Sequence, residues 1–373
     1  MQRQRGQAGR MRTSTRDLAE LRDRMRAWLS RRLGSPVEVS PLSRPAGNGL
    51  SSETLIFDAR RASPGDGRTM RCVARMAPAS EAVPVFPSYD LGRQFEVMRL
   101  VGERTAIAVP RTMWFEPDPE PMGAPFLVME RLRGQVPPDM TPYTMAGWLL
   151  DASPADRERL QRSSVEILAR LHETPFTARE LRPFEPPGRD SSALRRHVDD
   201  QRAYYEWAHG SLRIPVLERA FDWLEEHWPD APGPDVLNWG DARIGNVMYR
   251  DFTPVAVLDW EMAAVLPREA DLGWMIFLHR FFQDVAEMMG LPGLPGFMRR
   301  EDVCRAYREM TGHTPRDLDF YEMYAALRHG VIMARVWRRR IHFGEQPMPG
   351  DPDDLVLHRA SIERMLDGAR RRP

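Results

Sequence analysis

Residues 236–263 read VLNWGDARIGNVMYRDFTPVAVLDWEMA, the most informative pattern in the chain. The runs VMYR and PVAVL have the length and the intervening turn expected of a β-hairpin. Asp241 and Asn246 lie five residues apart before the hairpin, and Asp259 follows it. Carboxylate and amide oxygens gathered around a hairpin suit a hard divalent cation such as Mg²⁺. On the alternative interpretation, either fragment alone is a set of turn residues at the end of a strand.

The predicted secondary structure changes near residue 134. Before it, short extended runs alternate with Gly, Pro and Ser turns, and two helical patterns occur; after it, helical periodicity dominates. Strands are expected at 37–42, 53–59, 69–76, 112–116 and 125–131. The later helices are expected at 155–174, 192–209, 213–228, 267–289, 299–311, 316–343 and 353–370. We therefore predict an α+β, bilobal fold with a disordered Arg-rich arm (1–14), a small β-rich N-lobe (15–130) and a larger, mostly helical C-lobe (131–373).

The charged residues exclude several kinds of binding site and catalytic mechanism. All 53 basic residues are arginines, and 53 acidic residues balance them to a formal charge of zero. A chain without lysine cannot form a GxxxxGK[ST] phosphate loop, a Schiff base or a lysine nucleophile. Zero net charge gives no reason to expect a nucleic-acid or membrane partner. Arginines in the first 16 residues leave nucleic-acid binding as a weaker hypothesis.

The cysteines and the apolar runs indicate the cellular compartment of the protein. Cys72 and Cys304 are too far apart in sequence for a metal-ligand or disulfide pattern. The basic N-terminus has no apolar run behind it, and the apolar stretch 272–282 is too short to span a bilayer. The expectation is a cytoplasmic protein, with its oligomeric state left open.

The spacing of Asp241 and Asn246 is that of a kinase catalytic loop. The longer segment 239–274, WGDARIGNVMYRDFTPVAVLDWEMAAVLPREADLGW, resembles the signature of the aminoglycoside phosphotransferase-like kinases. It is most similar to the branch related to kinase domains fused to some acyl-CoA dehydrogenases. The resemblance extends from about residue 35 onward and includes the turn NGLSSET (48–54) and ARLH (169–172). It implies a protein-kinase-like fold.

The resemblance also implies roles for the polar residues of the hairpin region. Asp241 corresponds to the catalytic base that accepts the proton of a substrate hydroxyl. The positions that match the Mg²⁺ ligands are Asn246 and Asp259, with Glu261 as a further metal neighbour. Arg243 lies where many protein kinases place a Lys on the transferred phosphoryl group; its alternative interpretation is a solvated loop arginine.

The nucleotide site implied by the resemblance lies in the N-lobe. The loop 45–54 supplies glycine and hydroxyl groups to the phosphates through Gly49, Ser51, Ser52 and Thr54. Arg75 replaces the usual strand lysine, although it could also be a surface strand residue. Backbone groups from Glu130 to Leu132 would meet adenine. The sequence departs from the family's pattern at two places. On the helix after the third strand, either Gln94 or Glu96 pairs with Arg75, and the sequence leaves this choice open. Trp239 stands where the family usually has His.

The resulting functional hypothesis is a phosphotransferase that uses ATP and Mg²⁺ to phosphorylate a hydroxyl of a small molecule. The segment 192–230 mixes acidic residues with arginines, so it gives no acidic surplus for a polycationic aminoglycoside. Kinship with the acyl-CoA dehydrogenase-associated branch favours a hydroxyacid or hydroxyacyl-CoA acceptor. The alternative is a catalytically weak or inactive nucleotide-binding pseudokinase or scaffold, favoured by the missing lysine, Gln94 and Trp239.

Overall fold

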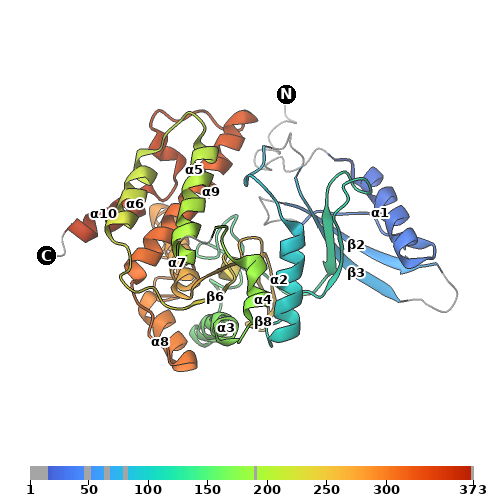
Figure 1. Cartoon of the computed structure of the whole chain (residues 1–373), viewed down its shortest axis with the longest axis horizontal. Helices are drawn as coiled ribbons and strands as arrows, with labels where there is room; N and C mark the ends of the chain where they lie inside the picture. Colours follow the sequence, from blue (N-terminus) through green and yellow to red (C-terminus); the bar gives the residue numbers. More distant parts are fainter. Residues whose placement is uncertain (1–15, 46–51, 63–67, 79–82, 189–190, 371–373) are drawn as a thin grey trace.

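The computed structural model describes residues 16–45, 52–62, 68–78, 83–188 and 191–370. The expected arm at 1–14 therefore lies outside the described residues. A β-rich lobe and a larger helical lobe lie side by side (Figure 1). The predicted α+β, bilobal architecture is confirmed. No helix in the described part of the chain is both long and apolar enough to cross a membrane.

The smaller lobe is built on an antiparallel five-stranded sheet in the order β1-β2-β3-β5-β4. Its strands are β1 (Val37–Val39), β2 (Glu53–Arg61), β3 (Thr69–Met76), β4 (Thr112–Glu116) and β5 (Phe126–Glu130). Four of them begin and end within two residues of a predicted strand, and β1 ends three residues before its predicted end at 42. Side chains of β5 alternate between two cores: Phe126 and Val128 join the N-lobe cluster, whereas Leu127 and Met129 join the cluster shared with the C-lobe.

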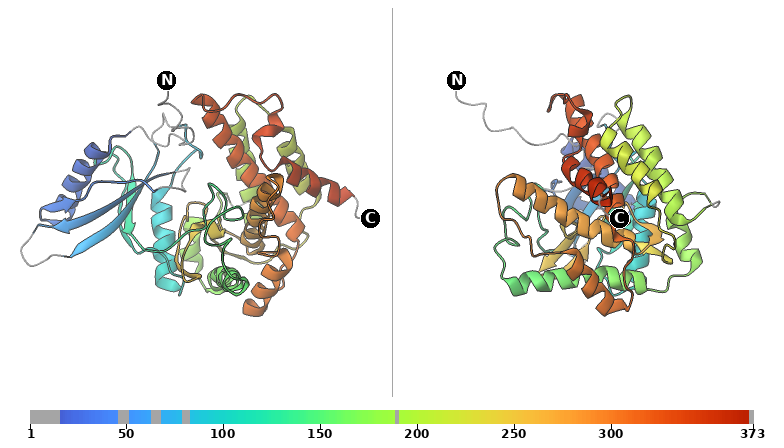
Figure 2. Two further views of the ribbon diagram at one scale, coloured as in Figure 1. Left: turned by 180° about the vertical axis from the view of Figure 1, so that it is seen from behind. Right: turned by 90° about the vertical axis from the view of Figure 1, so that its left-hand side faces the viewer.

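Two helices cover this sheet. Helix α1 (Leu18–Leu33) begins where Asp17 accepts hydrogen bonds from two backbone amides, and it ends at Gly34, which has φ 63°. Its Trp28 packs edge-on against Phe126, with ring centroids 4.8 Å apart. Helix α2 (Leu91–Arg104) lies between the sheet and the helical lobe (Figure 2). The apolar face of α2 thus joins the two lobes.

The larger lobe is mostly helical. Its helices are α3 (Pro154–Glu173), α4 (Ala178–Leu181), α5 (Ala193–His209), α6 (Pro215–Glu226), α7 (Glu269–Met288), α8 (Arg300–Thr311), α9 (Leu318–His342) and α10 (Arg359–Arg370). Helix α7 is buried along most of its length and packs against α9. The two helices approach closely because Gly273 has no side chain: a Cβ there would lie 2.7 Å from the backbone of Tyr321.

Two small sheets interrupt the helices and carry the polar loops. The predicted hairpin is present as β7 (Val247–Arg250) and β8 (Thr253–Val257). A second pair was not predicted: β6 (Asp235–Asn238) and β9 (Ala264–Pro267) are antiparallel and enclose the hairpin in the chain order. Each of these strands has four residues, too few for a clear alternating pattern.

One predicted helix is wrong. The periodicity over 353–370 suggests a single helix, but the structure has a 3₁₀ turn, η4 (Pro352–Leu355), and then α10. His358 lies between the two elements, with its side chain buried and its Nε2 2.9 Å from the carbonyl oxygen of Ala326 in α9. This contact satisfies a buried polar ring.

Candidate active site

The catalytic-type loop connects β6 to β7. It contains Asp241, a 3₁₀ turn η3 (Ile244–Asn246) and the buried Asn246. The Nδ2 of Asn246 donates to Asp241 Oδ2 at 2.6 Å, so the two predicted residues are in direct contact. The backbone amide of Leu258 donates to the carbonyl oxygen of Asn246 at 2.8 Å. That bond places the segment before Asp259 beside the loop.

Asp241 is held by donors from three places. Besides Asn246, Trp274 of α7 donates from Nε1 to Oδ1 at 2.8 Å, and Arg243 Nε lies 3.1 Å from the same oxygen. Burial raises the pKa of Asp241, and the adjacent Arg243 guanidinium acts against that rise. The carboxylate therefore has one orientation, set by hydrogen bonds to both oxygens.

Arg75, on β3, reaches across to the acidic residues of the C-lobe. Its Nη1 lies 2.8 Å from Asp259 Oδ1, and its Nη2 lies 3.4 Å from Glu261 Oε2. Ser52 accepts from Nε at 2.9 Å and from Nη2 at 2.6 Å. Thr54 pairs with Arg75 in the β2–β3 register. Residues predicted for the nucleotide and for the metal thus meet at one guanidinium.

Other predicted nucleotide-site residues are placed as follows. Gly49 and Ser51 lie outside the described residues. Glu130 ends β5, and its amide donates to the carbonyl oxygen of Arg111 at 2.9 Å. Leu132 is half-buried in the irregular segment that follows. These residues border the entry to the C-lobe, where Gln135 and Tyr249 form a β-bridge.

Helix α2 does not give Arg75 an acidic partner in this structure. Glu96 lies on the exposed face and accepts two hydrogen bonds from Arg99, at 2.9 and 3.1 Å. Gln94 is buried at 3% exposure. The ion pairs of Arg75 go to Asp259 and Glu261. Helix spacing explains the choice of face, since residues two apart point in different directions.

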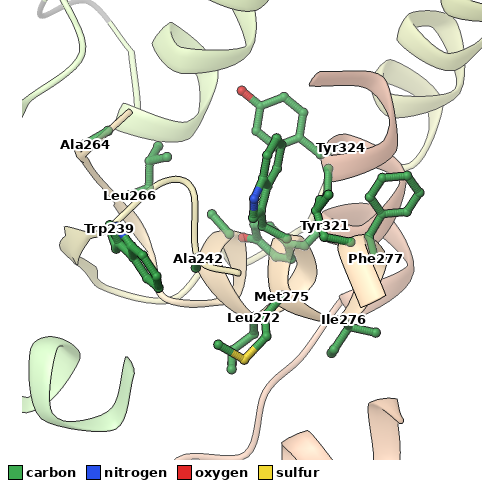
Figure 3. Close-up of a cluster of buried hydrophobic side chains, with 14 of the residues drawn as sticks. Trp239, Ala242, Ala264, Leu266, Leu272, Met275, Ile276, Phe277, Tyr321 and Tyr324 are labelled. Atoms are coloured by element: carbon green, nitrogen blue, oxygen red, sulfur yellow. The ribbon is translucent and has the colours of Figure 1, made fainter. Parts of the chain in front are cut away.

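Trp239 occupies the position of the expected His and is fully buried. Its indole Nε1 donates to the carbonyl oxygens of Leu258 and Asp259 at 2.9 and 3.1 Å. It therefore links the loop that holds Asp241 to the loop that holds Asp259. Figure 3 shows Trp239 and Ala242 of the first loop in one apolar cluster with side chains of α7 and α9.

The backbone of the loop is fixed by Asp271, one turn into α7. Its Oδ2 accepts from the amide of Trp239 at 2.7 Å, and its Oδ1 accepts from the amide of Gly240 at 2.8 Å. His172 lies beneath it, with Nε2 3.3 Å from Asp271 Oδ2 and Nδ1 2.8 Å from the hydroxyl of Tyr307. This buried hydrogen-bond network supports the backbone of the loop.

Three residues at the site were missed by the sequence reasoning. Asp139 binds Arg243, with Oδ2 2.5 Å from Nη1, and so ties that arginine to a segment a hundred residues earlier. Trp274 holds Asp241, and the buried Arg328 of α9 donates to the carbonyl oxygen of Gly240 at 3.3 Å. No sequence signal marks Asp139 or Arg328, whereas Trp274 belongs to the segment DLGW that was quoted for the resemblance.

The donor set fits Mg²⁺ that is bound partly by a nucleotide. In the described residues no three His, Cys, Asp or Glu side chains form a metal-binding group by themselves. Mg²⁺ usually takes one or two carboxylates and completes its octahedron with phosphates and water. The side chains of Asp259 and Asn246 supply such a partial set, with Glu261 beside it.

A separate cavity lies elsewhere in the larger lobe. It has a volume of about 510 Å³ and is bounded by residues of α6, α8, α9 and α10, including Trp223, Arg300 and Glu322. None of the residues around Asp241 lines it.

Comparison with known proteins identifies the family. The model of the phosphotransferase enzyme family (APH) matches residues 57–308. Human acyl-CoA dehydrogenase family member 11 is 26% identical over 195 residues, which make up 52% of this chain and 23% of the human protein. IBR3 of Arabidopsis thaliana, named as an acyl-CoA dehydrogenase, is 24% identical over 310 residues, or 79% of this chain and 36% of its own length. The chain thus spans well under half the length of these curated relatives.

Solved structures share the fold. A Ralstonia eutropha protein assigned to the aminoglycoside phosphotransferases superposes with a TM-score of 0.64 at 21% identity, covering 92% of this chain and 96% of its own. The macrolide 2'-phosphotransferase MphH of Brachybacterium faecium gives a TM-score of 0.53 at 17% identity, covering 92% and 98%. The resemblance inferred from 239–274 is confirmed. Since the family model covers more than half of the chain, this protein belongs to the phosphotransferase enzyme family.

Proposed function

We propose that this protein is a kinase that transfers the γ-phosphoryl group of ATP, with Mg²⁺, to a hydroxyl group of a small molecule. The observation that carries the proposal is the meeting of Arg75 from the N-lobe with Asp259, beside the pair Asp241 and Asn246. A cation donor for phosphates, oxygen ligands for a metal and a carboxylate base then share one site. Related structures contain AMP-PNP, ADP or GDP, which supports a nucleotide as the phosphoryl donor.

Each polar residue of the site has its own role in this phosphoryl transfer. Asp241 orients the acceptor hydroxyl and takes its proton as the new O–P bond forms, while the bond between the γ-phosphorus and the β-phosphate oxygen breaks and ADP leaves. Asn246 and Asp259 would hold Mg²⁺, which would supply positive charge to offset that of the phosphates. Arg75 would bind phosphate oxygens in place of the carboxylates it contacts here, because guanidinium groups bind both through paired hydrogen bonds. Arg243 is a second cation at the base.

For the acceptor we propose a hydroxyacid or hydroxyacyl-CoA rather than an aminoglycoside. Acidic side chains of α5 and α6 are committed to arginines: Arg195 binds both Asp199 and Glu225, and Arg213 binds Glu218. A polycationic acceptor would have to displace these arginines. The curated relatives named as acyl-CoA dehydrogenases support acyl chemistry. Turnover of aminoglycosides, with none of hydroxyacids or hydroxyacyl thioesters in the same assay, would contradict this choice.

A nucleotide-binding scaffold is the second candidate, and Arg75 favours it. In place of a lysine, the N-lobe offers an arginine already paired with Asp259 and Glu261. If those ion pairs are the resting state of a non-catalytic protein, nucleotides will bind without phosphoryl transfer. Release of ADP in the presence of a hydroxyl acceptor would rule the scaffold out.

The first experiment is a thermal-shift titration with ATP and MgCl₂ on wild type and Asp259→Ala. A ligand that binds only the folded state at 100 times its Kd stabilises it by about 2.7 kcal/mol, which raises the Tm by several degrees. We expect a Mg²⁺-dependent shift in wild type that is lost in Asp259→Ala. Asp23→Ala is the matched control, because Asp23 is an exposed residue of α1 that pairs with Arg22, away from this site. No shift with any nucleotide would contradict the proposal.

A further inference from the structure

The side chain that fixes Asp241 from below is Trp274. It is 2% exposed, and its only polar atom, Nε1, donates to Asp241 Oδ1 at 2.8 Å. Trp274 lies three residues after Asp271, so both point from one face of α7 toward the loop. Asp271 fixes the loop's backbone amides, and Trp274 fixes the carboxylate itself.

Trp274 is in turn backed by Arg328. The guanidinium carbon of Arg328 lies 4.6 Å from the centroid of the Trp274 ring, a cation–π geometry. Nη2 of the same arginine donates to the carbonyl oxygen of Gly240 at 3.3 Å. Arg328 thus contacts the loop directly on one side and through the indole on the other. The close approach of α7 and α9 at Gly273 brings it there.

Arg328 is a costly residue for a core. It is 2% exposed, and its Nε has no hydrogen-bond partner among the described residues. Burial lowers the pKa of this guanidinium, since desolvation disfavours its charged form. An arginine remains protonated even so. A buried charge with incomplete hydrogen bonding lowers stability, so a role in packing alone would be served better by an apolar side chain.

We propose that Trp274 and Arg328 are positioning residues for Asp241. The cation above the indole ring draws electron density from it and strengthens the N–H as a donor to Oδ1. Asn246 occupies Oδ2. The carboxylate is thereby held in one rotamer, facing the place where the acceptor hydroxyl must arrive. The inference rests on the proposed function, in which Asp241 is the base.

The test is a double-mutant cycle on Mg²⁺-dependent ATP hydrolysis, with water as the acceptor. Trp274→Phe keeps an aromatic ring under Arg328 but removes the N–H. We expect it to lower kcat about 10- to 100-fold, the effect of a small misplacement at a reacting group. The KM for ATP and the thermal shift with ATP and MgCl₂ should stay at wild-type values. In an Asp241→Asn background, Trp274→Phe should cause no further loss, because the two act as one unit.

The controls separate positioning from packing. Trp228→Phe is matched, because Arg195 lies 4.3 Å from that ring centroid in the same lobe but away from Asp241; it should leave kcat within twofold of wild type. Arg328→Lys keeps a cation over the ring and should recover part of the activity that Arg328→Met loses. If Trp274→Phe does not melt cooperatively, this second pair carries the test.

Two outcomes would overturn the inference alone: Trp274→Phe as active as Trp228→Phe, or losses that add fully in the double variant. Equal activity of Arg328→Lys and Arg328→Met, both at wild-type level, would do the same. A wild-type protein that neither binds nor hydrolyses ATP with Mg²⁺ would overturn the proposed function and the inference with it.

Discussion

At the scale of single residues, the site shows how an unusual side chain takes over a bracing role. Trp239 stands where the resemblance leads one to expect His, and its indole N–H reaches two backbone carbonyls of the neighbouring loop. An indole N–H is a donor and the ring offers no acceptor, so it can pair only with hydrogen-bond acceptors such as these carbonyl oxygens. The loops of Asp241 and Asp259 are therefore joined by a donor that acts at any physiological pH.

Replacing Trp239 tests this link between the loops of Asp241 and Asp259. Trp239→Phe removes the shared N–H donor and leaves a small void in a fully buried position. We expect the free energy of unfolding to fall by about 2 kcal/mol, from the two unsatisfied carbonyls and the lost volume. Urea denaturation followed by circular dichroism measures it. Trp207→Phe is the control, since Trp207 is 38% exposed and should change stability by less than about 0.5 kcal/mol. Equal effects of the two substitutions would contradict the bracing role.

At the scale of elements, α7 and α9 form the support on which the catalytic-type loop rests. Helix α7 presents Asp271 and Trp274 to the loop, and α9 adds Arg328 behind them. The pair must lie close together for all three to reach. The backbone contact at Gly273 permits that approach, because any larger residue would push Tyr321 and its helix away.

Gly273→Ala probes this contact. The added Cβ would lie 2.7 Å from backbone atoms of Tyr321, which cannot move without shifting α9. We expect a loss of about 1–3 kcal/mol in the free energy of unfolding, typical of an overpacked core. Gly296→Ala is the matched control, because nothing lies within 4 Å of its Cβ position. A Gly273→Ala protein as stable as Gly296→Ala would show that the two helices are not tightly packed there.

At the scale of the whole molecule, several buried histidines lie in the core of the larger lobe. Burial lowers the pKa of His279 and of His358 from 6.5 to about 4. His279 bonds the hydroxyl of Tyr143 and the carbonyl oxygen of Leu294, and His358 bonds the carbonyl oxygen of Ala326. Both are therefore neutral in the folded protein at neutral pH.

These groups predict acid sensitivity. Between pH 6.5 and about 4 the unfolded chain binds protons that the folded chain does not, so the free energy of unfolding falls as the pH is lowered through that window. Each unit of pKa difference contributes about 1.4 kcal/mol at 25 °C. Urea denaturation at pH 7 and pH 5 should show the loss, and His279→Gln should reduce it. A flat profile across that range would contradict the neutral, buried state of these rings.

The sequence by itself determined the architecture and supplied the candidate residues of the site. Periodicity and turn residues located the five strands of the N-lobe and most C-lobe helices. An element buried on one face has apolar residues at regular spacing, and this pattern is visible in the local sequence. The segment 239–274 indicated the family and contains Asp241, Asn246 and Asp259. For these three residues local spacing sufficed, since a loop and a hairpin bring them together with little help from distant parts of the chain. Arg75 was proposed from its position in a strand of the N-lobe, far from this segment in sequence.

Only the tertiary structure shows which side chains support the candidate site residues. Asp139, Trp274 and Arg328 reach the loop from three separate elements, and no spacing in the sequence encodes those approaches. It also decided that Arg75 pairs with Asp259 and Glu261 across the lobes rather than with α2. It also placed His358, in the break before α10, against the carbonyl oxygen of Ala326 in α9. Contacts between elements depend on how helices and sheets pack, and packing is a property of the folded whole.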